Sequence, residues 1–405
     1  MPRVVVCGAG PGGASLAYLL ARRGIDTTLV ERQNDFAREF RGEAVMPSGL
    51  DAFRQMGLED DFEQLDQTRP QRVRLYRKGR FRIEFSAEGQ GLDDVLPRVV
   101  SQPAMLEMLV SRCSAFPSFR FVRGGVVSDL EMDGDRAVGV KLRGAVDETL
   151  PCDLVVGADG RGSVVRKRSG LLEDHDVERF DIVWFKVPRP QFVEHPDETA
   201  LVFLNTGHIM LSFPSYDGSL QVGWIIEKGT FGDIRRRGVE QWVDEMAEHA
   251  GPEFGAHLRS ARDHLVHPFV LDVVCYTMPR WTAPGTMLLG DAAHPMSPVG
   301  GQGINIALRD ALVAANHLVP VLEANGSPEQ IDAATRAFQD ERMPEIETIQ
   351  TMQRIPPRVI FGRSWWSRAL LAAVPTLARI QVLGARGGPV IGRFAFGITD
   401  VKLAV

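Results

Sequence analysis

The 405-residue chain is poor in cysteine and has no excess of basic residues. Its four cysteines form no CxxC pair or metal-ligand spacing, so we expect buried, reduced thiols and no metal site. Lysine and arginine number 46 against 52 aspartates and glutamates, a net charge of −6. This balance argues against a nucleic-acid-binding surface.

Long apolar runs are also missing. No stretch is long and apolar enough to span a membrane, and the first apolar run is broken by Gly10, Pro11 and Gly12, which excludes a signal peptide. At about 150 residues per domain, the length suggests two or three structural units. We therefore expect a soluble, cytoplasmic enzyme.

Glycine is concentrated near the start of the chain, in GAGPGG at residues 8–13. This segment lies between an apolar strand at 4–7 and an amphipathic helix at 14–23. Gly8 permits a tight turn, Gly10 lets the backbone approach phosphates, and Gly13 allows close helix–strand packing. The free N–H groups and positive dipole at the start of the helix would then bind a pyrophosphate.

An acidic residue follows the next strand at the distance that a dinucleotide site requires. The strand at 27–30 ends in Glu31, followed by Arg32. The Glu31 carboxylate can accept hydrogen bonds from ribose hydroxyls and would repel a 2′-phosphate, so the site is not built for NADP. An ordinary glycine-rich turn does not explain this acid, and the sequence therefore predicts a dinucleotide site.

Two later segments extend the pattern. The strand at 154–156 ends in Gly157, Ala158, Asp159 and Gly160. GDAAHP at 290–295 is followed by GGQG at 300–303, which opens a helix expected at 302–318.

GAGPGG, DLVVGADGRGSVVR at 153–166 and MLLGDAAHPMSPVGGQGINIALRDA at 287–311 together resemble the group A flavoprotein monooxygenases, which share the fold of p-hydroxybenzoate hydroxylase. The resemblance implies an α/β fold: a Rossmann-like FAD-binding domain interleaved with a β-sheet substrate domain, and a helical C-terminal region. The expected boundaries are 1–72, 98–178 and 268–320 for the FAD-binding domain, 73–97 and 179–267 for the substrate domain, and 321–405 for the C-terminal region.

The resemblance also implies the residues that hold FAD. Asp291 would accept a hydrogen bond from the ribitol chain, and residues 300–303 would wrap the pyrimidine edge of the flavin. The positions assigned to the cofactor are Gly8, Gly10, Pro11, Gly12, Gly13, Glu31, Arg32, Arg41, Gln102, Asp159, Gly160, Gly290, Asp291, Pro298, Gly300, Gly301, Gln302, Gly303 and Asn305.

Several of these assignments have plain alternatives. Arg41 and Gln102 can each be ordinary surface residues. Asp159 can cap the helix that follows it, with or without touching FAD, because aspartate is a strong N-cap residue. Arg166 is either a cofactor contact or a solvated helix charge, and we favour the solvated charge.

A β-rich region between the FAD segments would form a roof over the flavin. Residues 73–85 alternate around Lys78 and Gly79, which is typical of a hairpin. Further strands are expected at 182–187, 200–204, 208–214 and 220–227. Met210, Phe213 and Trp224 are candidates for lining the pocket, although alternate positions of a strand also face solvent or helices, and each is more often a core residue than a substrate contact.

No residue is required as an acid or base. Pro298, expected against the reactive face of the flavin, and His208, in the roof, are the candidates near the reacting centre, whereas His294 fits a packing role in its turn. The resemblance implies that NADH or NADPH reduces FAD. A flavin hydroperoxide formed with molecular oxygen would then hydroxylate or epoxidise a small aromatic or hydrophobic substrate. Alternatives are a flavin reductase of isoprenoid double bonds and a flavin halogenase, for which Lys78 would be the lysine.

The C-terminal region carries one unusual charge pattern. Residues 348–399 contain no acid but seven arginines. Either this stretch makes weak contact with a membrane surface, or it is a helical layer on the FAD-binding domain or a dimer contact, which we favour. We expect a monomer or a homodimer.

Overall fold

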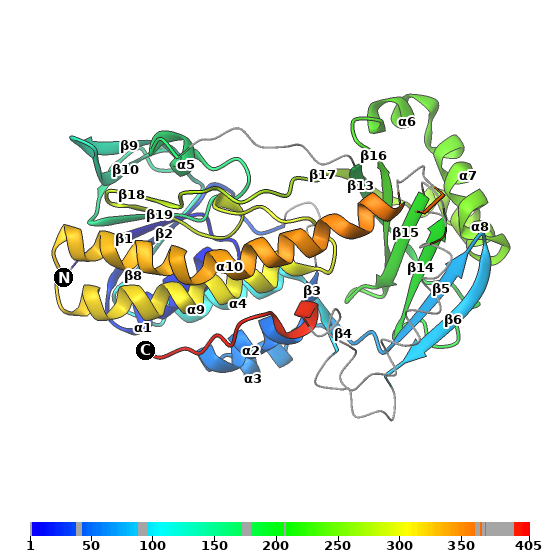
Figure 1. Cartoon of the computed structure of the whole chain (residues 1–405), viewed down its shortest axis with the longest axis horizontal. Helices are drawn as coiled ribbons and strands as arrows, with labels where there is room; N and C mark the ends of the chain where they lie inside the picture. Colours follow the sequence, from blue (N-terminus) through cyan, green and yellow to red (C-terminus); the bar gives the residue numbers. More distant parts are fainter. Residues whose placement is uncertain are drawn as a thin grey trace.

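The computed structural model describes residues 2–37, 43–87, 96–171, 180–205, 208–360, 365–366, 369 and 393–405, with the side chains of 208, 266, 267 and 356–360 excepted. Two large sheets divide the molecule (Figure 1). Among the described residues, no helix combines the length and apolar composition needed to cross a membrane.

The first sheet is mainly parallel. Its strand order is β18 (Thr282–Ala283), β19 (Thr286–Leu288), β12 (Leu154–Gly157), β1 (Arg3–Cys7), β2 (Asp26–Glu31) and β8 (Phe119–Arg123). Four of the five residues of β1 and all four of β12 are buried. Burial on both faces explains why these strands read as continuous apolar runs rather than as alternating patterns.

The second sheet is mixed. Its strand order is β17 (Val266–Asp272), β13 (Phe180–Pro188), β16 (Ser219–Glu227), β15 (His208–Pro214), β14 (Thr199–Asn205), β5 (Arg72–Arg77) and β6 (Arg80–Ser86). Three helices cover its outer side: α6 (Phe231–Arg237), α7 (Val239–Ala250) and α8 (Pro252–Ser260). The sequence predicted six of the seven strands but missed β17 and these helices.

The β5–β6 hairpin confirms that the two units are interleaved. Lys78 and Gly79 have φ angles of 50° and 67°, as a tight two-residue hairpin turn requires. β5 pairs in parallel with β14, more than a hundred residues later. The chain therefore leaves the first unit, contributes a hairpin to the second sheet and returns.

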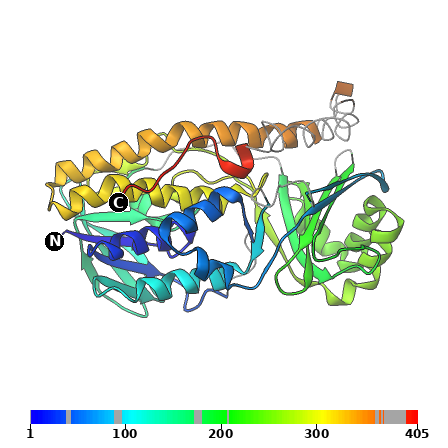
Figure 2. The ribbon, with the colours of Figure 1, turned by 90° about the horizontal axis from the view of Figure 1, so that it is seen from below.

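Helices pack together in the first unit, and one of them extends toward the second sheet. α1 (Pro11–Arg22) packs against α4 (Gln102–Cys113) and α9 (Gln302–Glu323), and α10 (Pro328–Ile360) lies along α9 and extends toward the second sheet (Figures 1 and 2). The last residues, 393–405, return along α2 (Pro47–Met56) and α9. Most of the arginine-rich stretch lies outside the described residues, so its two interpretations stay predictions.

Smaller elements complete the first unit. They are α2 as above, α3 (Glu59–Glu63), α5 (Val164–Arg168), the three-stranded sheet of β9 (Gly125–Asp133), β10 (Arg136–Gly144) and β11 (Thr149–Pro151), and that of β3 (Ala44–Val45), β4 (Gln67–Thr68) and β7 (Arg98–Val100). All four cysteines are buried and none of them forms a disulfide, and burial raises the pKa of the Cys113 and Cys152 thiols to about 12.

Candidate FAD site

The three glycine-bearing segments meet at one edge of the parallel sheet. β1, β12 and β19 are adjacent and parallel, so their carboxyl ends lie together. The Ala158 N–H donates to the Cys7 carbonyl oxygen at 2.8 Å, and the Leu289 N–H donates to the Gly157 carbonyl oxygen at 2.9 Å. Ligands of open α/β sheets bind outside such an edge, which makes it the natural cofactor position.

Three glycines are required by close contacts within this edge. Gly8 has a φ of 107°, and a Cβ there would lie 2.4 Å from the Ala158 oxygen. A Cβ on Gly13 would lie 2.0 Å from the Gly8 oxygen. At Gly12 it would lie 2.4 Å from Leu289 Cδ2, so this glycine fits the first segment against the third, a role that sequence reasoning missed.

Three other glycines face open space, one in each segment. No heavy atom of the described part lies within 4 Å of a Cβ built on Gly10, Gly160 or Gly303, apart from immediate chain neighbours. Gly10 is also the N-cap of α1, where no described side chain bonds to the free N–H groups. Each segment thus has open space at one glycine, and the open space at Gly10 lies beside the N–H groups at the start of α1 that no described side chain binds. This arrangement fits a long cofactor with a pyrophosphate at its middle.

Glu31 is buried and already holds the first turn. Its carboxylate accepts hydrogen bonds from the backbone N–H groups of Ala9 and Gln33, each at 3.0 Å. A carboxylate has further acceptor positions, so binding of a ribose by Glu31 stays a prediction. The neighbouring Arg32 is exposed.

Asp159 caps the helix that follows it. Its Oδ2 accepts from the N–H groups of Val164 and Val165 at 2.6 and 3.2 Å, and Ser163 Oγ donates to its Oδ1. The capping interpretation is therefore confirmed, because both carboxylate oxygens serve α5. Its contact with FAD stays a prediction.

Arg161 and Arg166 hold the segment that contains Asp291. The sequence analysis did not name Arg161 and assigned Arg166 to solvent. Arg161 Nε lies 3.3 Å from Asp291 Oδ2, and its guanidinium also donates to the Asp272 carbonyl at 2.6 Å. Arg166 is buried and donates to the carbonyl oxygens of Ala292 and Arg161, at 2.7 and 2.6 Å. The prediction of a solvated charge at Arg166 is wrong, because the guanidinium joins the second and third segments.

The turn before α9 depends on left-handed glycines and on buried amides. Gly300 and Gly301 have φ angles of 78° and 63°. Gln302 Nε2 donates to the Gly300 oxygen at 2.7 Å, and Asn305 Nδ2 donates to the Gly301 oxygen at 2.7 Å. Asn305 Oδ1 accepts from the Met46 N–H at 2.8 Å. These side chains support the turn, which leaves backbone groups as the expected flavin contacts.

The remaining predicted cofactor residues are less defined. Pro298 precedes this turn, and its oxygen accepts from the Gly301 N–H at 3.0 Å. Gln102 is the first residue of α4, whose N-cap Ser101 accepts from the Ala104 N–H. Arg41 and the His208 side chain lie outside the described residues.

His294 has the structural role expected of it. It is buried, its ring centroid lies 4.8 Å from that of Trp281, and its Nε2 lies 2.9 Å from Asp310 Oδ2. Burial raises the pKa of Asp310, but His294 and Arg342 together outweigh this effect and lower it.

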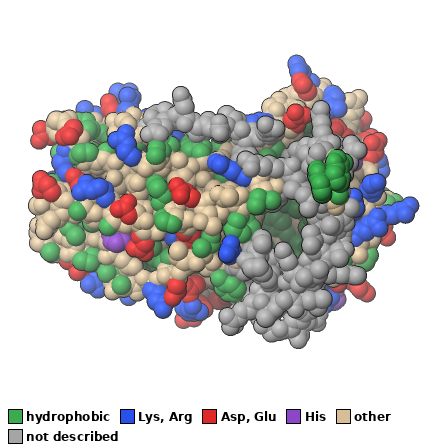
Figure 3. Space-filling view, in the orientation of Figure 1, with side chains coloured by type: hydrophobic (Ala, Val, Ile, Leu, Met, Phe, Trp, Pro, Cys, Tyr) green, Lys and Arg blue, Asp and Glu red, His purple; other side chains and the backbone are tan. Residues whose placement is uncertain are grey.

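The inner face of the second sheet is turned toward the first unit, and Figure 3 shows a recess between the two halves with apolar side chains in it. Trp184 and Ile225 are buried on this face, with Phe213 partly buried beside them. Met210 and Trp224 lie on the opposite face, in the core under α6–α8. Their assignment to the pocket is wrong, because side chains alternate along a strand and a single sequence does not show which set faces inward.

A polar row crosses the same inner face. Phe213, Gln221 and Lys186 are neighbours in register on β15, β16 and β13. Gln221 is fully buried, yet neither atom of its amide has a hydrogen-bond partner among the described residues. Lys186 Nζ lies 3.0 Å from Glu43 Oε1 and donates to Ser215 Oγ at 2.8 Å.

Glu43 brings the first unit into this row. It directly precedes β3 and is buried, and its carboxylate also accepts from Ser215 Oγ at 2.7 Å. Burial raises the pKa of Glu43, and the opposing effects of Lys186 and Ser215 are smaller. No local pattern in the sequence indicates this pair.

The sequence matches the FAD binding domain family over residues 1–347, and the chain belongs to that family of FAD-binding monooxygenases. The enzyme is an FAD-dependent monooxygenase, an oxidoreductase of the group that uses NAD(P)H. It is 31% identical over 405 residues to a 6-methylpretetramide 4-monooxygenase of Streptomyces rimosus, covering 99% of this chain and 93% of that one. It is 28% identical to kynurenine 3-monooxygenase of Stenotrophomonas maltophilia, covering 86% and 77%.

Solved structures show the same fold. p-Nitrophenol 4-monooxygenase PnpA of Pseudomonas putida superposes with a TM-score of 0.78 at 20% identity, covering 97% of this chain and 95% of that one. PqsL of P. aeruginosa gives 0.76 at 18% identity, covering 91% and 99%. The family match and the relatives, rather than the shared fold, show that monooxygenase is the class that holds among the three that the sequence left open.

Proposed function

We propose that this monooxygenase hydroxylates an aromatic ring of a small, largely hydrophobic substrate held between FAD and the inner face of the second sheet. The observation that carries the proposal is the composition of that face, where Trp184 and Phe213 meet edge to face at 5.9 Å beside a single polar row. Pockets for small molecules are typically apolar and aromatic, with a few polar groups that set orientation.

The relatives support a position-specific hydroxylation. The names of the Streptomyces rimosus and Stenotrophomonas maltophilia enzymes each denote a monooxygenase acting at one numbered position of a small molecule. The first of these matches along nearly the whole chain, including the second sheet. We therefore infer that this chain also holds its substrate in one orientation.

Gln221 is the group best suited to set that orientation. A buried polar group without a partner costs about 1–3 kcal/mol, and a hydroxyl or carbonyl of the substrate could remove this cost. Lys186, next to it in register, is already held by Glu43, Ser215 and Asp217, so Gln221 offers the free donor and acceptor of this row among the described residues. The Gln221 amide would bind the polar end of the substrate while Trp184 and Phe213 contact its apolar body.

The protein contributes binding, orientation and exclusion of water. FAD, when bound, supplies the redox and oxygen chemistry. The Trp184 ring lies over Gly223, where a Cβ would come within 2.6 Å of it, so a glycine on β16 lets the indole cover the inner face. A dry apolar face at this position limits unproductive reaction with water.

The test is a screen of reductant and oxygen consumption against phenols, polyketides, quinolones and isoprenoids, with NADH and NADPH in parallel. We expect an aromatic compound to stimulate oxygen uptake and to acquire one labelled oxygen atom on its ring. Gln221→Leu should raise KM for that compound about tenfold or more, whereas Gln64→Leu, a change at the C-cap of α3 in the first unit, should not. Stimulation by isoprenoids alone would contradict the proposal.

Epoxidation is the second candidate. Squalene epoxidase 6 of Arabidopsis thaliana is 23% identical over 370 residues, covering 89% of this chain and 69% of that one. An apolar inner face would also accommodate an alkene. The isoprenoid arm of the screen separates the two, because epoxidation consumes the double bond of an alkene, whereas hydroxylation replaces a hydrogen of a ring that stays aromatic.

A further inference from the structure

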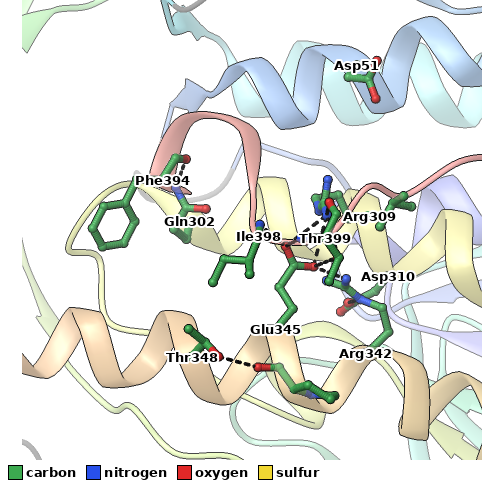
Figure 4. Close-up of polar contacts among 12 residues, drawn as sticks. Asp51, Gln302, Arg309, Asp310, Arg342, Glu345, Thr348, Phe394, Ile398 and Thr399 are labelled. Carbon is green, nitrogen blue, oxygen red and sulfur yellow. Dashed lines mark hydrogen bonds and ion pairs between the residues drawn. The ribbon is translucent and has the colours of Figure 1, made fainter. Parts of the chain in front are cut away.

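Four charged side chains form a buried network between α9 and α10. Arg309, Asp310, Arg342 and Glu345 are each at most 3% exposed (Figure 4). Arg342 Nε donates to Asp310 Oδ1 at 2.8 Å, Arg309 donates to Glu345 Oε1 at 3.0 Å, and Arg342 also pairs with Glu345. Buried ion pairs add little net stability compared with apolar packing, so the placement of this network points to a positional role.

One end of the network contacts the turn at residues 290–294, called the Gly290 turn below. Asp310 Oδ2 accepts from the Gly290 N–H at 3.3 Å and lies 2.9 Å from His294 Nε2. Gly290 and His294 flank Asp291, the residue expected to bind the ribitol chain. The Asp310 carboxylate therefore sets where Asp291 lies.

The other end holds the C-terminal segment, residues 393–405. Arg309 donates to the Thr399 carbonyl oxygen at 2.7 Å, and Glu345 Oε1 accepts from the Ile398 N–H at 2.8 Å (Figure 4). Gly397 has a φ of 81°, and a Cβ there would lie 2.8 Å from Glu345 Oε1. The segment thus fits closely against the charged groups, and glycine is needed at the point of contact.

The C-terminal segment also contacts the turn at 300–302, which we expect to contact the flavin. Gln302 Nε2 donates to the Phe394 carbonyl oxygen at 2.8 Å (Figure 4). The Phe394 ring lies against Gly300, where a Cβ would come within 2.7 Å of it. Farther along, the Leu403 N–H donates to Gln55 Oε1 at 2.6 Å, which ties the end of the chain to α2.

We propose that Glu345 and Arg309 are positioning residues of the FAD site, which act by fixing the C-terminal segment as a permanent wall beside the flavin. Through this network the Gly290 turn and the turn at 300–302 are held in one relative geometry. The inference rests on FAD binding, which the family shows, and on the site residues predicted above, to which it adds residues 393–400. Small displacements of binding groups are costly, so a loosened segment should weaken FAD and admit solvent to it.

The test compares Glu345→Gln with a matched control. Glu341→Gln removes a charge from the same helix, where Glu341 Oε2 lies 2.8 Å from His317 Nε2 of α9 at the surface. The measurements are the FAD dissociation constant of the stripped protein and iodide quenching of bound flavin fluorescence, both well below the unfolding temperature. We expect Glu345→Gln to weaken FAD at least tenfold and to increase quenching at least twofold, with the control unchanged.

A second variant separates an effect on FAD binding from a failure of Glu345→Gln to fold. Thr399→Val removes an oxygen that lies 3.1 Å from an Arg309 nitrogen and 3.0 Å from Glu345 Oε2, and it leaves every charge paired. It should weaken FAD about threefold and raise quenching in the same direction. A lower unfolding temperature with wild-type FAD affinity and quenching in either variant would overturn the proposal. Neither measurement needs a substrate, so failure here is distinguishable from failure of the proposed hydroxylation.

Discussion

Replacement of Gly10 or Gly13 by alanine should weaken FAD binding in both cases, but only the change at Gly13 should destabilise the apoprotein. A Cβ at Gly13 would lie 2.0 Å from the Gly8 oxygen and 3.0 Å from the Ala158 Cβ. Optimal contacts between heavy atoms are about 3.5 Å or more, so the turn would have to open by more than about 1 Å. Overpacking of this kind costs about 1–3 kcal/mol, and Gly13→Ala should destabilise the apoprotein as well as weaken FAD.

Gly10→Ala should leave the apoprotein almost intact. No described heavy atom lies within 4 Å of the added methyl group, and a φ of −71° suits alanine. Alanine is a weaker N-cap than glycine, which we expect to cost less than about 1 kcal/mol. The methyl group would, however, occupy space that we assign to the pyrophosphate, so FAD should bind at least tenfold more weakly, which is about 1.4 kcal/mol.

The assay is thermal unfolding of stripped protein together with FAD titration by flavin fluorescence. Gly232→Ala is the control, because it also meets open space but lies in α6, far from the sheet edge. If Gly10→Ala binds FAD as the wild type does, the pyrophosphate does not lie at the start of α1, and the placement of FAD is refuted. Unfolding of Gly13→Ala at the wild-type temperature would equally refute the steric need for glycine at that position.

Three further outcomes are expected. Asp291→Ala should strip most FAD during purification, visible as loss of the yellow absorbance; a normally yellow protein would contradict the assignment. Arg342 and Arg309 outweigh burial and lower the pKa of Glu345 from 4.5 to about 2. A carboxyl group whose pKa is lowered in the folded protein stabilises the fold at pH values above the pKa that it has in the unfolded chain. Roughly 3 kcal/mol of unfolding free energy should therefore be lost as pH falls from 4.5 toward 2. Glu345→Gln should flatten this part of the acid-unfolding curve. Gly223→Ala should displace the Trp184 ring, raising KM for the aromatic substrate while leaving FAD affinity unchanged.

Local patterns predicted three of the six strands of the first sheet, β1, β2 and β12, because their determinants are local, whereas β8, β18 and β19 were missed. Strand, turn and helix follow one another within residues 3–22, and the steric need for Gly8 and Gly13 arises inside that stretch. The hairpin at Lys78 and Gly79 is equally local. The helices α6–α8 were missed because their apolar residues become meaningful only as the cover of the second sheet.

The errors have one physical origin. Arg166 was assigned to solvent because the sequence of so short a helix does not indicate which of its sides is buried. In the structure its guanidinium is buried against carbonyl oxygens of two segments. Met210 and Trp224 are apolar and stand at alternate positions of their strands, as residues of one sheet face do. Which of the two faces is the inner one depends on where α6–α8 pack. In both cases a distant element decides the environment of the side chain, and no window of sequence contains that information.

The inner polar row shows the same limit at the site itself. Lys186 and Glu43 come from different units and meet only because β13 lies beside the segment that precedes β3. Each alone resembles an ordinary surface charge in the sequence. In the structure Glu43 is buried and Lys186 partly buried, and Lys186 also pairs with Asp217, so the loss of Lys186 would leave the buried Glu43 carboxylate without its cation. The charged pair thus holds the two units together beside Gln221, whose unpartnered amide is the group that we expect to bind a polar substrate atom.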